Sequence, residues 1–147
     1  MKSFLVTSVA LLSFLASTAG GEKSATTNQY VKFSSKLSNS SLKPGGSGHL
    51  LVSLKPVKGI HINLKPAMSV RFDSLSEVRP NGDLEIPKKG EYLDAAGNIR
   101  IPIIVPASRT PGNAVLRAEL TYYYCSDAEG WCSRFKQPIE LSLTVKK

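Results

Sequence analysis

The sequence has few of the residues with which enzymes bind metals or activate nucleophiles. Its 147 residues include two histidines, two cysteines and one tryptophan. No serine lies in a nucleophile-elbow motif, and neither His49 nor His61 has a suitable triad partner, which disfavours a hydrolase. The histidines, Met68 and the cysteines also lack the clustered spacing of a metal site. We therefore expect no metal and no cofactor.

After its N-terminal segment, the sequence also lacks an apolar run long enough to cross a membrane. The one long run, Phe4–Ala16, has 13 residues, fewer than the roughly 20 that span a bilayer. It follows Lys2 and precedes the small residues Ser17-Thr18-Ala19, which is the pattern of a secretory signal peptide. We expect residues 1–19 to be cleaved after Ala19, and the mature protein to be periplasmic or secreted, without stable membrane insertion. An uncleaved anchor is the less favoured alternative.

Clusters of like charge are absent, although the chain is basic. The 128 residues after Ala19 contain 18 basic and 11 acidic side chains, a net charge of +7. Export separates such a protein from nucleic acid, and its basic residues are scattered rather than grouped on one segment. We expect no nucleic-acid partner and a monomeric protein. The positive charge serves solubility, or a loose attraction to acidic envelope components.

A sustained helical period is also missing. Residues 20–28 are small and polar and predict a disordered leader, so we expect one domain over residues 29–147. Short alternating segments follow, separated by Pro, Gly, Asn and Asp. Seven or eight antiparallel strands of this kind predict an all-β, immunoglobulin-like β-sandwich. The expected strands are residues 30–35, 49–54, 59–64, 69–72, 76–78, 98–105, 116–124 and 139–145, with an irregular segment over residues 84–96.

The last two strands bring the cysteines together. Even-numbered residues from Leu116 to Tyr124 share one face, and the odd-numbered residues from Ile139 to Val145 face inward. Residues 126–131 would join these strands into an edge hairpin whose ends carry Cys125 and Cys132. Cys125 then lies on the face opposite Tyr124.

In an oxidising compartment the two cysteines are expected to form a disulfide. It would close a loop of eight residues, which constrains the unfolded chain by roughly 2.5 kcal/mol on the loop-entropy model. The usual immunoglobulin disulfide closes a much longer loop across the core. A short bridge can be a static staple or can be exchanged between proteins, and the spacing alone favours the staple.

Three segments carry a resemblance to a known family. They are Gly59-Ile60-His61-Ile62-Asn63 with Pro66 soon after, Ile101-Pro102-Ile103, and Leu120-Thr121-Tyr122-Tyr123-Tyr124-Cys125-Ser126-Asp127-Ala128-Glu129-Gly130-Trp131-Cys132. Over most of residues 30–145 the chain resembles the periplasmic N-terminal domain of the thiol:disulfide interchange protein DsbD, as a free-standing copy. The resemblance implies an immunoglobulin-like fold and a cysteine pair that carries electrons from a membrane transporter to thioredoxin-like proteins and disulfide isomerases. The chain would then be a component of a protein-disulfide reductase.

The resemblance also assigns roles to residues. Cys125 and Cys132 would be the exchanging pair, with Cys132 forming the mixed disulfide and Cys125 resolving it. His61 and Asn63 occupy the positions of tyrosines that flank the site in the family. Tyr92 lies in the stretch that matches the family's cap loop, and Trp131 is either an anchor for a partner or a cover over the disulfide.

Some features depart from the family. Six residues separate the cysteines here instead of five, Ser133-Arg134-Phe135-Lys136 replaces an aromatic residue and prolines, and Lys88-Lys89 lies in the cap stretch. We also expect a free-standing domain that ends at Lys147, without the transmembrane and thioredoxin-like domains that follow it in the family. A hairpin has no helix N-terminus to favour a thiolate, so exchange would depend on a thiolate brought by the partner. The alternative is a non-catalytic envelope binding or structural module with a static hairpin disulfide.

Overall fold

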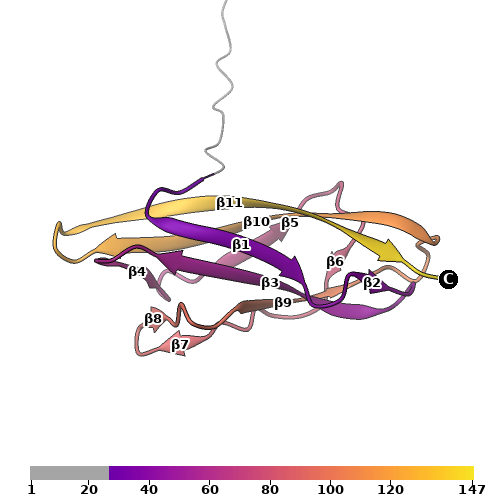
Figure 1. The fold of residues 1–147 in the computed structure, drawn as a ribbon, viewed down its shortest axis with the longest axis horizontal. Coiled ribbons are helices and arrows are strands. Elements are labelled where there is room, and N and C mark those ends of the chain that lie inside the picture. Colours follow the sequence, from indigo (N-terminus) through magenta and orange to yellow (C-terminus); the bar gives the residue numbers. More distant parts are fainter. Residues whose placement is uncertain (1–26) are drawn as a thin grey trace, which may run out of the picture.

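The computed structural model describes residues 27–147, so the expected signal peptide and residues 20–26 of the leader lie outside it. The described residues form two β-sheets and contain no helix, which confirms the predicted all-β sandwich (Figure 1). None of these residues belongs to a helix with the length and hydropathy needed to cross a membrane.

The two sheets differ in size and lie face to face (Figure 1). The first sheet has four strands in the order β1 (Val31–Leu37), β3 (Ser47–Pro56), β9 (Ile99–Ile104) and β6 (Arg79–Pro80). The second has seven, in the order β2 (Ser41–Leu42), β11 (Trp131–Val145), β10 (Gly112–Ser126), β4 (Ile60–Asn63), β8 (Tyr92–Leu93) and β7 (Lys88–Lys89), with β5 (Ser69–Phe72) also beside β10. Seven of these strands have four or more residues, and the other four are two-residue strands.

Alternating apolar residues of both sheets fill the space between them. Strand side chains alternate between two faces, so every second residue points inward. The predicted inward face of β10 is confirmed, because each of its members is buried. On β11 the predicted inward residues are also buried, apart from the half-buried Leu141. The core includes Leu50, Val52, Leu54, Ile99, Ile101, Ile103, Leu116, Leu120 and Tyr122, each with at most 1 % of its surface exposed.

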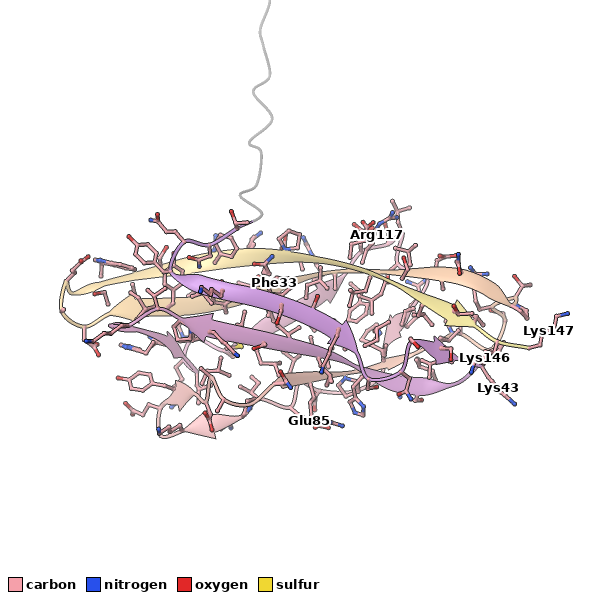
Figure 2. The ribbon with its side chains drawn as sticks, viewed as in Figure 1. Phe33, Lys43, Glu85, Arg117, Lys146 and Lys147 are labelled. Atoms are coloured by element: carbon pink, nitrogen blue, oxygen red, sulfur yellow. A yellow bond between two sulfur atoms is a disulfide. The ribbon has the colours of Figure 1, made fainter. Side chains whose placement is uncertain are left out.

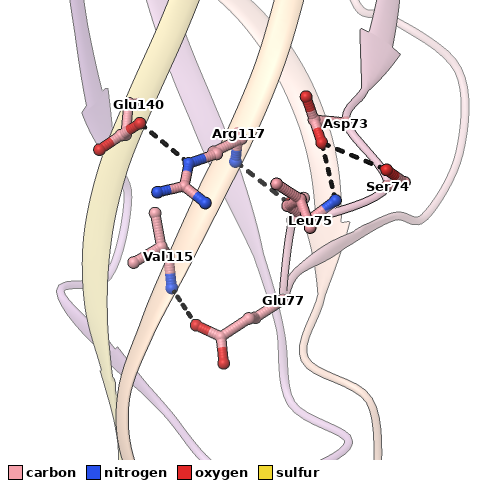
Figure 3. Close-up of polar contacts among 8 residues, drawn as sticks. Asp73, Ser74, Leu75, Glu77, Val115, Arg117 and Glu140 are labelled. Carbon is pink, nitrogen blue, oxygen red and sulfur yellow. Dashed lines mark hydrogen bonds and ion pairs between the residues drawn. The ribbon is translucent and has the colours of Figure 1, made fainter.

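One expected strand, residues 76–78, does not form. This segment carries the chain from β5 in the second sheet to β6 in the first, and its side chains complete the ladder along β10. Val115 N donates to Glu77 Oε2 at 2.8 Å, and Arg117 N donates to Ser76 Oγ at 3.1 Å (Figure 3). The Arg117 side chain bonds to Glu140 Oε2 at 2.9 Å, and this contact raises the pKa of Arg117.

Other boundaries also differ from the sequence predictions: β11, expected over residues 139–145, begins at Trp131, and β10, expected from residue 116, begins at Gly112. Asn28, expected in the disordered leader, forms an isolated bridge with Val31 and donates to the Tyr122 hydroxyl at 3.1 Å. The segment 84–96, expected to be irregular, contains the small β7–β8 hairpin. The alternation of apolar and polar residues does not reveal a single polar side chain that reaches the core. It also does not reveal a strand of only two residues.

The exposed lysines include a group far from the cysteines. Lys43, Lys146 and Lys147 lie at the end of the sandwich where the chain terminates, and the β10–β11 turn lies at the other end (Figure 2). In physiological salt the charges of these lysines are screened before they reach the turn, so they have little electrostatic effect there.

We expect the ionisation of Tyr122 to lower the stability of the folded protein at high pH. Burial raises the pKa of Tyr122 to about 12, whereas the hydrogen bond from Asn28 acts in the opposite direction. An unfolded tyrosine ionises near pH 10. Below that pH, wild type should be more stable than Tyr122→Phe by about 1 kcal/mol, owing to the Asn28 bond. Between pH 10 and 12 that difference should fall by up to about 1.4 kcal/mol per pH unit, because ionisation favours the unfolded chain.

Urea unfolding of both proteins from pH 8 to pH 11.5 measures this difference. The comparison cancels the titration of lysines, which are the same in both proteins. A difference that stays constant above pH 10 would contradict the prediction.

Candidate functional site

The β10–β11 hairpin places the two cysteines directly opposite each other. Its strands pair over fifteen residue pairs without interruption, and Cys125 pairs with Cys132 one step before the turn. The structure contains the Cys125–Cys132 disulfide, with 4.1 Å between the Cα atoms. Gly130, at φ 67°, ends the turn, and its N–H donates to Ser126 O at 2.9 Å. The predicted hairpin that carries both cysteines is therefore present.

The two cysteines have different surroundings. Cys125 has 4 % of its surface exposed, whereas Cys132 is an exposed residue. The cause is their position in the sheet: β10 is an interior strand with β4 on its other side, and among residues 27–147 β11 has no such neighbour at this end. Near the turn, only β11, the strand that carries Cys132, is therefore an edge strand.

Strand β4 brings His61 and Asn63 to the buried sulfur. His61 pairs with Cys125 in the sheet, and Asn63 pairs with Tyr123. Asn63 Nδ2 donates a hydrogen bond to Cys125 Sγ at 3.0 Å. Asn63 Oδ1 is buried and has no hydrogen-bond partner among the described residues. The amide is therefore held by its contact with the sulfur rather than by a polar network of its own.

The β7–β8 hairpin continues the sheet beyond β4 and brings Tyr92 to the site. Tyr92 pairs with Asn63, and its ring lies 4.1 Å from the His61 ring between centroids, at an angle of 48°. Tyr92 is 39 % exposed. The cap stretch suggested by the resemblance therefore lies next to His61, which separates Tyr92 from Cys125 across the sheet.

These residues surround an open hollow of about 730 Å³, which we call the cysteine hollow. Cys125, Cys132, His61, Asn63, Tyr92 and Trp131 all border it, so the structure brings together every site residue proposed from the sequence. Its lining also includes Lys65, Lys88, Glu91 and Asp127. Glu91 lies in the stretch matched to the cap loop but was given no role there, and Lys65 carried no signal in the sequence, because its place beside the hollow depends on the pairing of β4 with β8.

Charged groups at the hollow are mostly exposed. His61 Nδ1 lies 3.2 Å from Asp127 Oδ2, and the two side chains are 19 % and 78 % exposed. A polar contact with one side so exposed is screened by water and contributes little to stability. Its effect is to hold the imidazole over the turn, near the disulfide.

Trp131 packs mainly away from the cysteines. Neighbouring residues on a strand point to opposite faces, so its ring lies on the core side of β11. The ring centroid is 5.0 Å from that of Tyr30 and 5.9 Å from that of Tyr124, and the indole N–H donates to the Glu129 carboxylate. Trp131 borders the cysteine hollow but does not lie over the disulfide as a lid.

The residues weighed as metal ligands do not all lie together. His49 lies on β3 in the first sheet, against the guanidinium of Arg100, while His61 lies in the second. Within residues 27–147 no group of three or more His, Cys, Asp or Glu side chains could hold a metal ion.

Comparisons of the chain with models of protein families, with curated proteins and with solved structures found no match. The function of the site is therefore inferred from its own geometry.

The unequal burial of the cysteines predicts unequal reactivity once the disulfide is reduced. Iodoacetamide should alkylate Cys132 at least about ten times faster than Cys125, because a buried thiol reacts only after local opening. Peptide mass spectrometry after timed quenching measures both rates. In urea the two rates should converge, which serves as the control. Equal rates in the folded protein would show that Cys125 is as accessible as Cys132.

Proposed function

We propose that this protein is an exported thiol-disulfide exchange module that passes electrons between a membrane reductase and periplasmic thioredoxin-like proteins. The observation that carries the proposal is the asymmetry of the bridge: Cys132 is exposed beside an open hollow, and Cys125 is buried with a hydrogen-bond donor on its sulfur. A partner therefore reaches Cys132 more readily than Cys125, which favours a fixed order of exchange.

The proposed chemistry has two steps. A partner thiolate attacks Cys132 Sγ, the Cys125–Cys132 bond breaks, and Cys125 leaves as a thiolate with the electron pair. A second thiolate of the partner then attacks the partner's own sulfur in the mixed disulfide and releases Cys132 as a thiolate. The partner becomes a disulfide and the cysteine pair gains two electrons. In the next exchange the Cys132 thiolate attacks a disulfide of the acceptor, and Cys125 resolves the mixed disulfide.

Asn63 supports the leaving group in this scheme. Its amide N–H already bonds to Cys125 Sγ in the disulfide, and a hydrogen bond to a charged acceptor is stronger than one to a neutral acceptor. The bond therefore strengthens as negative charge develops on Cys125. Because β4 fixes Asn63 by pairing with β10, the donor is in place before the attack.

A second candidate is a non-catalytic envelope binding or structural module in which the disulfide is static. One observation favours it: the bridge joins two residues that are already directly paired in a long ladder. There it reinforces the turn and needs no change in the backbone of either strand. The two candidates differ in reduction potential, since a static bridge lies below about −300 mV and an exchanging one lies near that of its partners.

The first test measures the potential and traps the partner. Equilibration of the mature protein against glutathione and thioredoxin buffers should give a potential above about −300 mV. Thioredoxin without its resolving cysteine, activated as a mixed disulfide with thionitrobenzoate, is the trap. The Cys132 thiolate of Cys125→Ser should displace thionitrobenzoate and accumulate a stable mixed disulfide, and the matched variant Cys132→Ser should accumulate little, because its remaining thiol is buried. A bridge that stays oxidised in all buffers, together with no trapped complex, would support the static module.

The second test concerns Asn63. Asn63→Leu keeps the size of the side chain, removes the donor and also removes the unpaired Oδ1. We expect reduction of its disulfide by dithiothreitol to slow by about tenfold relative to wild type, with little change in the melting temperature. Tyr92→Phe is the control, since it changes the same hollow without touching the sulfur. A wild-type rate in Asn63→Leu would show that the amide does not assist the leaving thiolate.

A further inference from the structure

The outer edge of β11 near Cys132 has no strand beside it among the described residues. Strand β2 pairs with β11 at Thr144 and Val145 only. From Trp131 to Leu143 the pairing of β11 is confined to its other side, where β10 lies. Whether this edge can accept another chain depends on which of its residues direct N–H and C=O groups outward.

Contacts on the side of β10 away from β11 show which of its residues direct their main-chain groups outward. Asp73 N donates to Arg117 O and Glu77 N donates to Val115 O, both at 2.9 Å, so these odd-numbered residues of β10 direct their main-chain groups away from β11. In an antiparallel ladder the residues opposite them also direct theirs away from the partner strand.

Contacts at the other end of β11 give the same answer. Thr144 N donates to Ser40 O at 3.0 Å, so this even-numbered residue directs its N–H to the outer edge. The register runs from Gly112–Val145 to Ser126–Trp131 without a bulge, so the alternation holds along the whole strand. The 4.1 Å between the Cα atoms of Cys125 and Cys132 also fits the close, non-hydrogen-bonded type of pair.

It follows that Cys132, Arg134 and Lys136 direct their N–H groups to the open edge. Pro138, the next residue of this set, has no N–H and ends the run of donors. The main chain of Cys125, in contrast, already has a partner strand, because its N–H and C=O face His61 on β4. Only the exposed cysteine of the pair therefore offers its backbone to another molecule.

The side chains on this edge disfavour a second copy of the same chain. Arg134 and Lys136 are both exposed and carry the same charge, and such residues on an edge strand oppose pairing with an identical edge. The occupant that fits is therefore a different protein, one that has reason to approach Cys132.

We propose that the thiol protein that attacks Cys132 docks by adding an extended segment to the outer edge of β11, with main-chain hydrogen bonds to Cys132 and Arg134. This inference rests on the proposed exchange function and adds the mode of recognition. Main-chain pairing gives affinity with little demand on partner sequence. Because one of the bonds is made to the residue whose sulfur is attacked, the docked segment also positions the partner thiolate.

The variant Arg134→Pro removes one outward N–H and leaves the inward bonds of Ser133 and Phe135 to β10 intact. Pro138 shows that proline is accommodated at this parity of the strand. The matched control is Arg134→Gln, which loses the charge and keeps the N–H. Reduced thioredoxin and dithiothreitol are the two reductants, because only the first has an extended segment to add.

We expect Arg134→Pro to be reduced by thioredoxin about ten times more slowly than Arg134→Gln, because it loses one main-chain hydrogen bond to the partner. The rates with dithiothreitol should agree within about twofold. Equal thioredoxin rates in two folded variants would overturn edge docking and leave the exchange function standing. If wild type is not reduced by thioredoxin at all, the exchange function fails and the docking inference fails with it.

A measurement on the unmutated edge covers the case in which Arg134→Pro does not fold. In the trapped complex of Cys125→Ser with thioredoxin, hydrogen exchange by NMR should show new protection of the Cys132 and Arg134 amides relative to free Cys125→Ser. Ser133 and Phe135, which bond to β10, should be protected in both states. Unchanged exchange at Cys132 and Arg134 in the complex would overturn the proposal.

Discussion

The unbroken pairing of β10 with β11 is the constraint on which the rest of the structure depends. Fifteen residue pairs in one register fix which side chains of both strands enter the core. The same register sets Cys125 opposite Cys132 and decides which main-chain groups face outward. A slip of one residue would reverse all three at once, because the side-chain period of a strand is two. The buried face that includes Leu116, Leu120 and Tyr122 makes such a slip costly.

The neighbours of this ladder give one disulfide two different ends. β4 covers the β10 side, adds the Asn63 donor and bonds to the main chain of Cys125. On the β11 side no strand of the described chain pairs with Cys132, which is an exposed residue. A staple that only closes a turn has no need of this asymmetry, whereas an exchanging pair uses it to determine which sulfur is attacked and which one leaves.

Much of the fold was predictable from the sequence, and the exceptions have physical reasons. The faces of β10 and β11 were predicted correctly because long strands with one buried face show a clear alternation. Residues 76–78 were wrongly expected to form a strand, since Ser76 and Glu77 complete the ladder of β10 with side-chain atoms instead. The β7–β8 hairpin was missed because two-residue strands are too short to show a period. Asn28 belongs to the fold through its bridge with Val31 and its hydrogen bond to Tyr122, which composition does not reveal.

The sequence by itself determined the two-sheet all-β class, the hairpin and the pairing of its only two cysteines, because these follow from local alternation and from short separations along the chain. It also suggested His61, Asn63 and Tyr92 as neighbours of the site, through a family resemblance. Only the tertiary structure decided that Cys125 is buried and Cys132 exposed, that Asn63 bonds to the buried sulfur, and that the main chain of Cys132 faces an open edge. Those features depend on which strands lie beside the hairpin, and strand order is set by contacts between residues far apart in the sequence.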